Sequence, residues 1–93
     1  MIGNEVKRAR GVISPGVPAE ALRRAWAARL EAGLAPEEKR LETDGQNFTL
    51  WHRTTWQKEG MRHAFLMVVQ QVSNLEADRV GRHKVEPKIE WSE

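Results

Sequence analysis

The chain has 93 residues, which is enough for one domain with one hydrophobic core and too few for two. Its apolar share of 40% and charged share of 30% are typical of a globular protein, and no apolar run approaches the roughly 20 residues of a membrane helix. The net charge of only +2 implies a weak general attraction to nucleic acid, so any basic surface has to come from local clustering.

Residues 1–17 contain only isolated apolar side chains and a Ser-Pro-Gly turn signal, and we predict that they form an extended N-terminal arm. They lack the apolar stretch of a secretory signal, and the whole chain lacks cysteine, so we expect a cytoplasmic protein without disulfides. One reading of the arm is a frayed end, and the other is a segment that becomes ordered on a partner. The charged residues of its basic cluster are Lys7, Arg8 and Arg10.

The clearest predicted element is a helix that begins at Pro18 and ends near Gly33, in the stretch PAEALRRAWAARLEAGL. Proline suits the first helical position, and glycine is typical of the residue that follows a helix. Large apolar side chains recur four residues apart at Leu22, Trp26 and Leu30. This narrow stripe predicts a helix that lies flat on a sheet, with Trp26 in the core.

The stretch from residue 51 to residue 69 fits two alternatives, of which we favour a β-hairpin. A strong Asp-Gly turn signal precedes it at residues 44–45. Residues 37–43, before this turn, are compatible with a short strand or with one helical turn. With residues 57–60 as the hairpin loop, Trp56 faces Met61, and the large apolar side chains of both arms share one face.

The alternative is one long helix over residues 61–80, because Met61, Phe65 and Val68 also fall at helical spacing. Such a helix would place basic residues in its first turn and acidic residues near its end. Each of these charges opposes the helix dipole by ~0.3–1 kcal/mol. The capping-box pattern Ser-Asn-Leu-Glu, which starts at Ser73, predicts instead a short helix over residues 74–80 that ends at Gly81.

The segment KVEPKIEW near the end alternates apolar and charged residues, and its Pro87 limits the predicted strand to the edge of a sheet. Residues 18–93 are therefore predicted to be a single α+β domain in the order α-β-β-α-β. The N-terminal helix packs on one face of a small antiparallel sheet. The predicted core consists of Leu22, Trp26, Leu30, Phe48, Leu50, Phe65 and Ile89.

The three histidines raise the question of metal or acid–base chemistry, and we predict no metal site, no cofactor and no catalytic residue. The hairpin would bring His52 and His63 together, whereas His83 joins them only if the loop before the last strand folds back. Structural and catalytic zinc sites usually have at least three protein ligands. The sequence also contains no nucleophile elbow, P-loop, dinucleotide-binding motif or zinc-protease motif.

If residues 61–80 form one helix, the order of elements is similar to that of the pterin carbinolamine dehydratases. The active site of that family requires a His-His-Pro stretch, and the candidate position here reads Arg82-His83-Lys84. We therefore assign no family from the sequence.

The reverse face of the predicted hairpin is the most informative surface, because Trp51, Arg53 and Arg62 lie together on it. Trp and Arg are the usual hot-spot residues of protein interfaces, and Trp also stacks on bases. We expect a small non-enzymatic accessory protein of bacterial or phage type that docks on a larger protein or nucleoprotein assembly through this face and the arm, without membrane contact. The first alternative is a nucleic-acid-binding module in which the basic cluster of the arm also contacts phosphates, and the second is a small enzyme.

Overall fold

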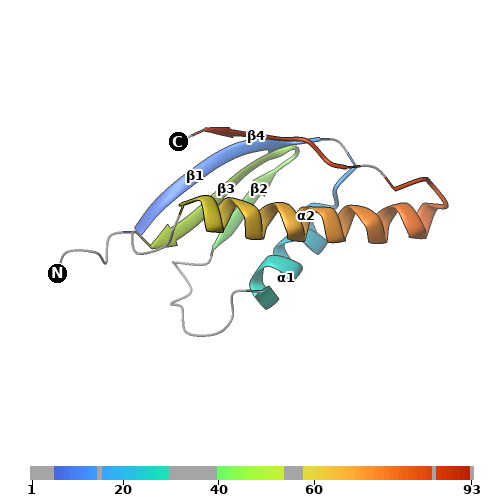
Figure 1. Cartoon of the computed structure of the whole chain (residues 1–93), viewed down its shortest axis with the longest axis horizontal. Helices are drawn as coiled ribbons and strands as arrows, with labels where there is room; N and C mark the ends of the chain where they lie inside the picture. The colour runs from blue at the N-terminus through green and yellow to red at the C-terminus, as the bar shows by residue number, and fades with distance from the viewer. Residues whose placement is uncertain (1–5, 15, 30–39, 54–57, 85, 93) are drawn as a thin grey trace.

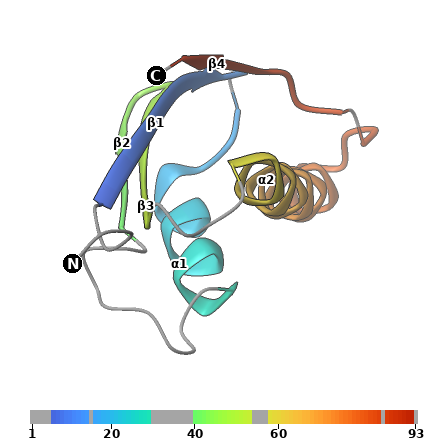
Figure 2. The same ribbon diagram turned by 60° about the vertical axis from the view of Figure 1, so that its left-hand side comes forward.

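The computed structural model describes residues 6–14, 16–29, 40–53, 58–84 and 86–92. Four strands form one sheet in the order β2-β3-β1-β4, and each neighbouring pair is antiparallel. Both helices lie on the concave side of this sheet (Figures 1 and 2). The elements are β1 (Val6–Ile13), α1 (Ala19–Arg29), β2 (Leu41–Asp44), β3 (Asn47–Arg53), α2 (Lys58–Val80) and β4 (Ile89–Ser92).

The predicted α+β class is confirmed, although the order of elements is β-α-β-β-α-β and has one more strand at its start. In this arrangement each helix connects two parallel strands that have a third, antiparallel strand between them, which is the split β-α-β or ferredoxin-like topology. In the part of the chain that the structure describes, neither helix has the length and apolar character needed to cross a bilayer.

The prediction of an extended arm over residues 1–17 is wrong for Val6–Ile13, which form a central strand of the sheet. This strand, β1, pairs with β3 on one side and with β4 on the other. The pattern is weak because the side of β1 that faces the helices has one large apolar residue, Ile13, after Lys7, Ala9 and Gly11. Central strands normally show several large apolar residues.

Gly11 explains why a strand with so little apolar volume can lie in the middle of the sheet. It faces Phe48 of β3 on one side and Trp91 of β4 on the other, and the two rings meet with their centroids 5.2 Å apart. A Cβ atom at Gly11 would clash with the backbone oxygen of Glu90 and lie 2.5 Å from the Phe48 ring. The aromatic neighbours therefore fill the volume above β1 that its own side chains leave empty.

The predicted hairpin over residues 51–69 is also wrong, because α2 runs without interruption from Lys58 to Val80. Both edges of β3 are already taken, one by β1 and the other by β2, so residues 61–69 have no edge of β3 to pair with. The short helix predicted over residues 74–80 is the last part of α2, and the Ser73 hydroxyl accepts no capping hydrogen bond from the described residues.

Energetic magnitudes explain why the long helix is preferred. It buries five large apolar side chains, each of which stabilises the fold by about 1.5–3 kcal/mol. The unfavourable charges near its ends cost at most ~1 kcal/mol each. At the C-terminal end, Glu76 and Asp78 are in addition paired with Arg79 and Lys84. The buried side chains are Met61, Phe65, Val68, Val69 and Val72.

The core lies between the concave face of the sheet and the two helices. Phe65 is at its centre, and the Phe65 ring contacts those of Trp26, Phe48 and Trp91 at centroid distances of 5.2, 4.9 and 5.7 Å. The predicted core is confirmed for Leu22, Trp26, Phe48, Leu50 and Phe65, and Ile89 packs against it half-buried. Leu30, the remaining predicted member, lies outside the described residues.

The signals for turns and helix ends have the expected effects. Gly45 takes a φ of 60° in the two-residue turn between β2 and β3, as the first position of a type II′ turn requires. Gly81 has a φ of 72° at the end of α2, where the amide of Arg82 donates to the carbonyl of Ala77 and completes a Schellman motif. The strand predicted for KVEPKIEW is confirmed for its last part, since the edge strand β4 begins at Ile89 and Pro87 precedes it.

Candidate functional site

The outer face of the sheet is the convex side that faces away from the helices, and none of the described elements covers it (Figure 2). The strand registers arrange its side chains in three rows that run across the strands. The first row contains Arg8, Trp51 and Arg40. The second contains Ser92, Arg10, Thr49 and Glu42, and the third contains Glu90, Val12, Asn47 and Asp44.

Trp51 is the aromatic centre of the first row, where two guanidinium groups lie over its ring. The Cζ atom of Arg40 is 4.3 Å from the ring centroid, and that of Arg8 is 5.8 Å away. These arginines reach the ring from the two sides of β3, because Arg8 belongs to β1 and Arg40 directly precedes β2. Such cation–π contacts contribute about 0.5–1 kcal/mol each at exposed sites.

Arg40 is held in place by its backbone and by its side chain. Its carbonyl oxygen accepts a hydrogen bond from the Trp51 amide at 3.0 Å, which continues the β2–β3 ladder by one residue. Its Nε lies 3.2 Å from a carboxylate oxygen of Glu42. Arg8 and Arg40 are both exposed, whereas Trp51 is half-buried beneath them. The first row therefore consists of one indole ring with two guanidinium groups over it, which we call the Arg–Trp–Arg stack.

Charge changes sign along the outer face. The first row contains two arginines and no carboxylate. The second contains one basic residue, Arg10, and one acidic residue, Glu42. The third contains two acidic residues, Asp44 and Glu90. Because the rows are about 7 Å apart along the strands, the basic and acidic ends are separated by more than one Debye length at physiological salt. A partner with an anionic group is therefore favoured at the Arg–Trp–Arg stack and disfavoured at the opposite end.

The structure brings together half of the six residues predicted for the partner-binding site. Arg8, Arg10 and Trp51 share the outer face. Lys7 lies on the opposite side of β1, across from His52. The backbone of Arg53 pairs with Val6, and the Arg53 side chain lies outside what the structure describes.

Arg62 was predicted beside Trp51 on a hairpin strand, but it belongs to the helix α2. Its guanidinium lies over the ring of Trp91 at 5.2 Å, on the side of the sheet that α2 covers. Arg40 replaces it beside Trp51 and was missed in the sequence. The Asp44-Gly45 turn contained the necessary signal, since extending its register backward places residue 40 opposite residue 51.

The predicted hairpin would have placed His52 beside His63, but this hairpin does not form. His52 is on β3, half-buried and facing the helices, and His63 is exposed on α2. Among the residues that the structure describes, no group of three or more His, Cys, Asp or Glu side chains has the arrangement of a metal site.

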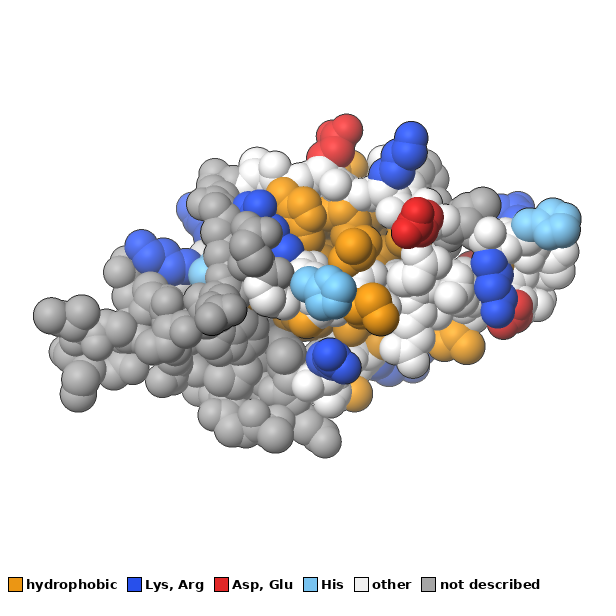
Figure 3. Space-filling model, viewed as in Figure 1, with side chains coloured by type: hydrophobic (Ala, Val, Ile, Leu, Met, Phe, Trp, Pro, Cys, Tyr) orange, Lys and Arg blue, Asp and Glu red, His pale blue; other side chains and the backbone are white. Residues whose placement is uncertain are grey.

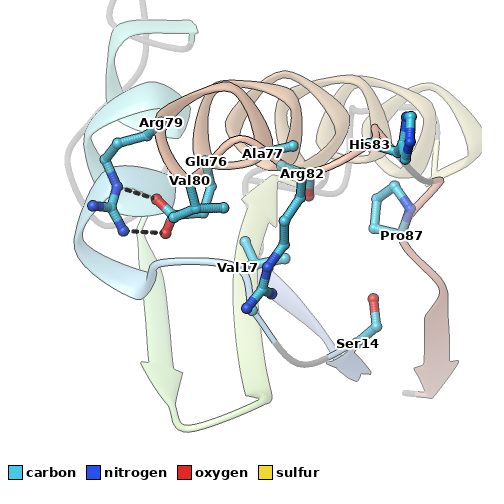
Figure 4. Close-up of a pocket in the computed structure, with 11 residues that line it drawn as sticks. Ser14, Val17, Glu76, Ala77, Arg79, Val80, Arg82, His83 and Pro87 are labelled. Carbon is cyan, nitrogen blue, oxygen red and sulfur yellow. Dashed lines mark hydrogen bonds and ion pairs between the residues drawn. The ribbon is translucent and has the colours of Figure 1, made fainter.

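A pocket of about 340 Å³ lies where the last turns of α2 meet the connections after β1 and before β4 (Figure 4). At its rim, hydrogen bonds from Arg79 lower the pKa of the Glu76 carboxyl, and Arg82 extends toward Val17 (Figure 4). The Ser73 Oγ is shielded from solvent and has no hydrogen-bond partner among the described residues. The lining contains one carboxylate, Glu76, which pairs with Arg79, and a second arginine, Arg82. A single exposed cation on a mixed lining does not define a class of ligand.

Four large apolar side chains of α2 are exposed: Leu66, Met67, Leu75 and Val80. At 100° per residue, Leu66 and Met67 point about 100° apart, and Leu75 points to the side opposite Leu66. These residues thus do not form one stripe. In the view fronted by α2, apolar atoms gather mainly in the middle of the surface with charged side chains around them (Figure 3). A modest apolar patch bounded by charged side chains is common on the surface of small domains.

The comparisons with known proteins identify no relative: no protein-family model, no curated protein and no solved structure matches this chain. The long helix that makes the order of elements similar to that of the pterin carbinolamine dehydratases is present. Arg82-His83-Lys84 follows it in the connection to β4, without the His-His-Pro stretch of that family. The function therefore has to be argued from the outer face itself.

Proposed function

We propose that this chain is a non-enzymatic accessory protein that docks on a larger nucleoprotein assembly through the outer face of its sheet. The single observation that carries the proposal is the Arg–Trp–Arg stack on a face that no described element covers. Trp and Arg are the residue types that dominate binding energy at interfaces, and here they form the centre of one row.

Folding alone does not account for the composition of this face. Trp51 is only half-buried, and the charged groups nearest to its ring are exposed. Exposed cation–π contacts and surface ion pairs contribute little to stability. A large rigid ring flanked by two long cationic side chains instead offers contact area and anion recognition to a partner. The absence of cysteine fits a role in a reducing compartment such as the cytoplasm.

A photo-crosslinking amino acid placed at single positions in cells that express the chain tests this proposal. The outer-face position is Thr49, which lies beside Arg10 in the second row, and the matched control is the exposed Gln71 on α2. We expect discrete crosslinked species from Thr49 that are absent from Gln71 and are abolished when Arg8→Glu is added. Equal crosslinking from both positions, or crosslinks from Thr49 that persist with Arg8→Glu, would contradict it.

A further inference from the structure

The Arg–Trp–Arg stack also indicates what kind of partner group it fits. Resting on the proposed docking function, we propose that the outer face binds a short single-stranded segment of nucleic acid, with one base on Trp51 and phosphates on Arg8, Arg10 and Arg40. Proteins read single strands by stacking unpaired bases on aromatic rings or guanidinium planes, and an open four-stranded sheet is one of the scaffolds that present such rings.

The location of the aromatic and basic residues supports this occupant. Trp51 is on β3, and Arg8 and Arg10 are on β1, and these are the two central strands of the sheet. Across three strands about 4.8 Å apart, the first row spans roughly 10 Å. A duplex keeps its bases stacked inside and has none to place on Trp51, so the surface favours single strands.

The bound state can be reached by an exchange of contacts around Trp51. In the free protein, the Arg40 guanidinium occupies a position over the ring that a base would take. Arg40 is exposed, and among the described residues its ion pair is an exposed one with Glu42, which contributes little. Its side chain can therefore move toward a phosphate at small cost.

The charge pattern limits the length and direction of the bound strand. A strand that ran from the first row to the third would bring phosphates near Asp44 and Glu90, which repel them. A strand that crosses the sheet along the first row meets Arg8, Trp51 and Arg40, and Glu42 is the carboxylate paired with Arg40 there. This geometry explains how a chain with a net charge of only +2 can bind nucleic acid locally. It also predicts a footprint of a few nucleotides and a modest affinity.

Fluorescence anisotropy with labelled 12-nucleotide oligo-dT and oligo-U tests the proposal, with a duplex of equal length and poly-glutamate as comparison anions. We expect single strands to bind more tightly than the duplex, and poly-glutamate to compete poorly. Trp51→Ala should weaken binding about tenfold or more, the typical effect of removing one stacking platform. Arg8→Glu should also lower the slope of log affinity against log salt by about 0.7 for each phosphate that the variant no longer neutralises.

The matched control is Arg82→Glu, which makes the same change in net charge in the connection after α2, away from the outer face. We expect it to bind nearly as the unaltered protein does. In nitrogen–proton NMR spectra, the indole signal that disappears in Trp51→Ala should shift when oligo-dT is added. Equal weakening in Arg8→Glu and Arg82→Glu, or poly-glutamate that competes as well as oligo-dT, would overturn the proposal in favour of unspecific attraction or an acidic protein segment.

The two proposals fail in distinguishable ways. If oligonucleotides do not bind but Thr49 still crosslinks to a protein in an Arg8-dependent manner, the choice of nucleic acid is wrong and docking through the outer face stands. If neither the oligonucleotides nor the crosslinks depend on Arg8, both proposals are wrong.

Discussion

The inner and outer faces of the sheet are built from alternate residues of the same strands, yet the inner face forms the core and the outer face is exposed. On β3, Phe48 and Leu50 face the helices and are at most 2% exposed, whereas the intervening Thr49 and the following Trp51 face outward. The inner face holds the fold together through ring contacts centred on Phe65. The outer face concentrates its aromatic and cationic groups where they contribute little to folding.

Two tryptophans make the difference concrete. Trp26 is 1% exposed and packs edge-on against Phe65, so its ring is surrounded by protein rather than by water. Trp51 is half-buried, and the groups that the structure places over its ring are guanidinium ions. The same residue type therefore serves stability on one face and, in our proposal, recognition on the other. The following substitutions test this division, beginning with the largest expected effect.

Phe65→Ala should lower the free energy of unfolding by about 3–5 kcal/mol, because it removes the ring that three other aromatic side chains contact. This loss is a large fraction of the stability of a small domain. Its control is Leu66→Ala, the next residue of α2, whose side chain is 40% exposed. Denaturant unfolding monitored by far-UV circular dichroism provides the comparison, and similar midpoints for the two variants would mean that the inner face is not the core.

Gly11→Ala should destabilise the fold by about 1–3 kcal/mol, the usual cost of inserting a methyl group into a filled space. The added Cβ would overlap the Phe48 ring and the Glu90 carbonyl oxygen, so the central strands would have to shift. Val12→Ala changes the neighbouring residue on the outer face and is expected to have a smaller effect. A thermal melt in which Gly11→Ala is as stable as the unaltered chain would contradict the close approach of Phe48 to β1.

Trp51→Ala should cost only about 1–2 kcal/mol of stability, since it removes two exposed cation–π contacts and a partly buried ring. Trp26→Ala is its matched comparison and should cost about 3–5 kcal/mol. Melting curves and oligonucleotide titrations measured on both proteins separate the two faces. Trp51→Ala should retain the fold and lose binding. A Trp51→Ala protein that unfolds as readily as Trp26→Ala would remove the distinction between the faces.

The smallest effect on stability is expected for the Arg79–Glu76 ion pair of α2, which belongs to neither face of the sheet. The hydrogen bond from Arg79 lowers the pKa of the Glu76 carboxyl in the folded protein. A lowered folded pKa adds stability above the unfolded pKa, and this contribution disappears as the pH falls through the folded value. Arg79→Ala should therefore raise the pKa of Glu76 toward its ordinary range, which carbon-detected NMR titration can measure. An unchanged titration would show that the pair is not formed in solution.

Local patterns in the sequence were sufficient for elements whose signal lies within a few residues. The alternation around Phe48 and Leu50 correctly assigned the two faces of β3, and the spacing of Leu22 and Trp26 identified the buried side of α1. Pro87 correctly indicated an edge strand. For β3 and α1 the pattern of burial along one segment is enough, because a strand turns alternate residues outward and a helix turns every third or fourth residue inward.

Other features depended on contacts between segments that are distant in the sequence. β1 is a strand because Phe48 and Trp91 fill the space above Gly11, and no local pattern in residues 6–13 contains that information. Residues 58–80 are helical because both edges of β3 are occupied and because one helix buries a whole seam of apolar side chains.

The composition of the candidate site depends on the same long-range contacts. Arg62 lies at Trp91 instead of Trp51, and Arg8 and Arg40 lie at the Trp51 ring. The sequence by itself determined that Trp51 faces outward, since this follows from alternation along one strand. Only the tertiary structure decided which cations lie beside it, because that depends on which strands become its neighbours.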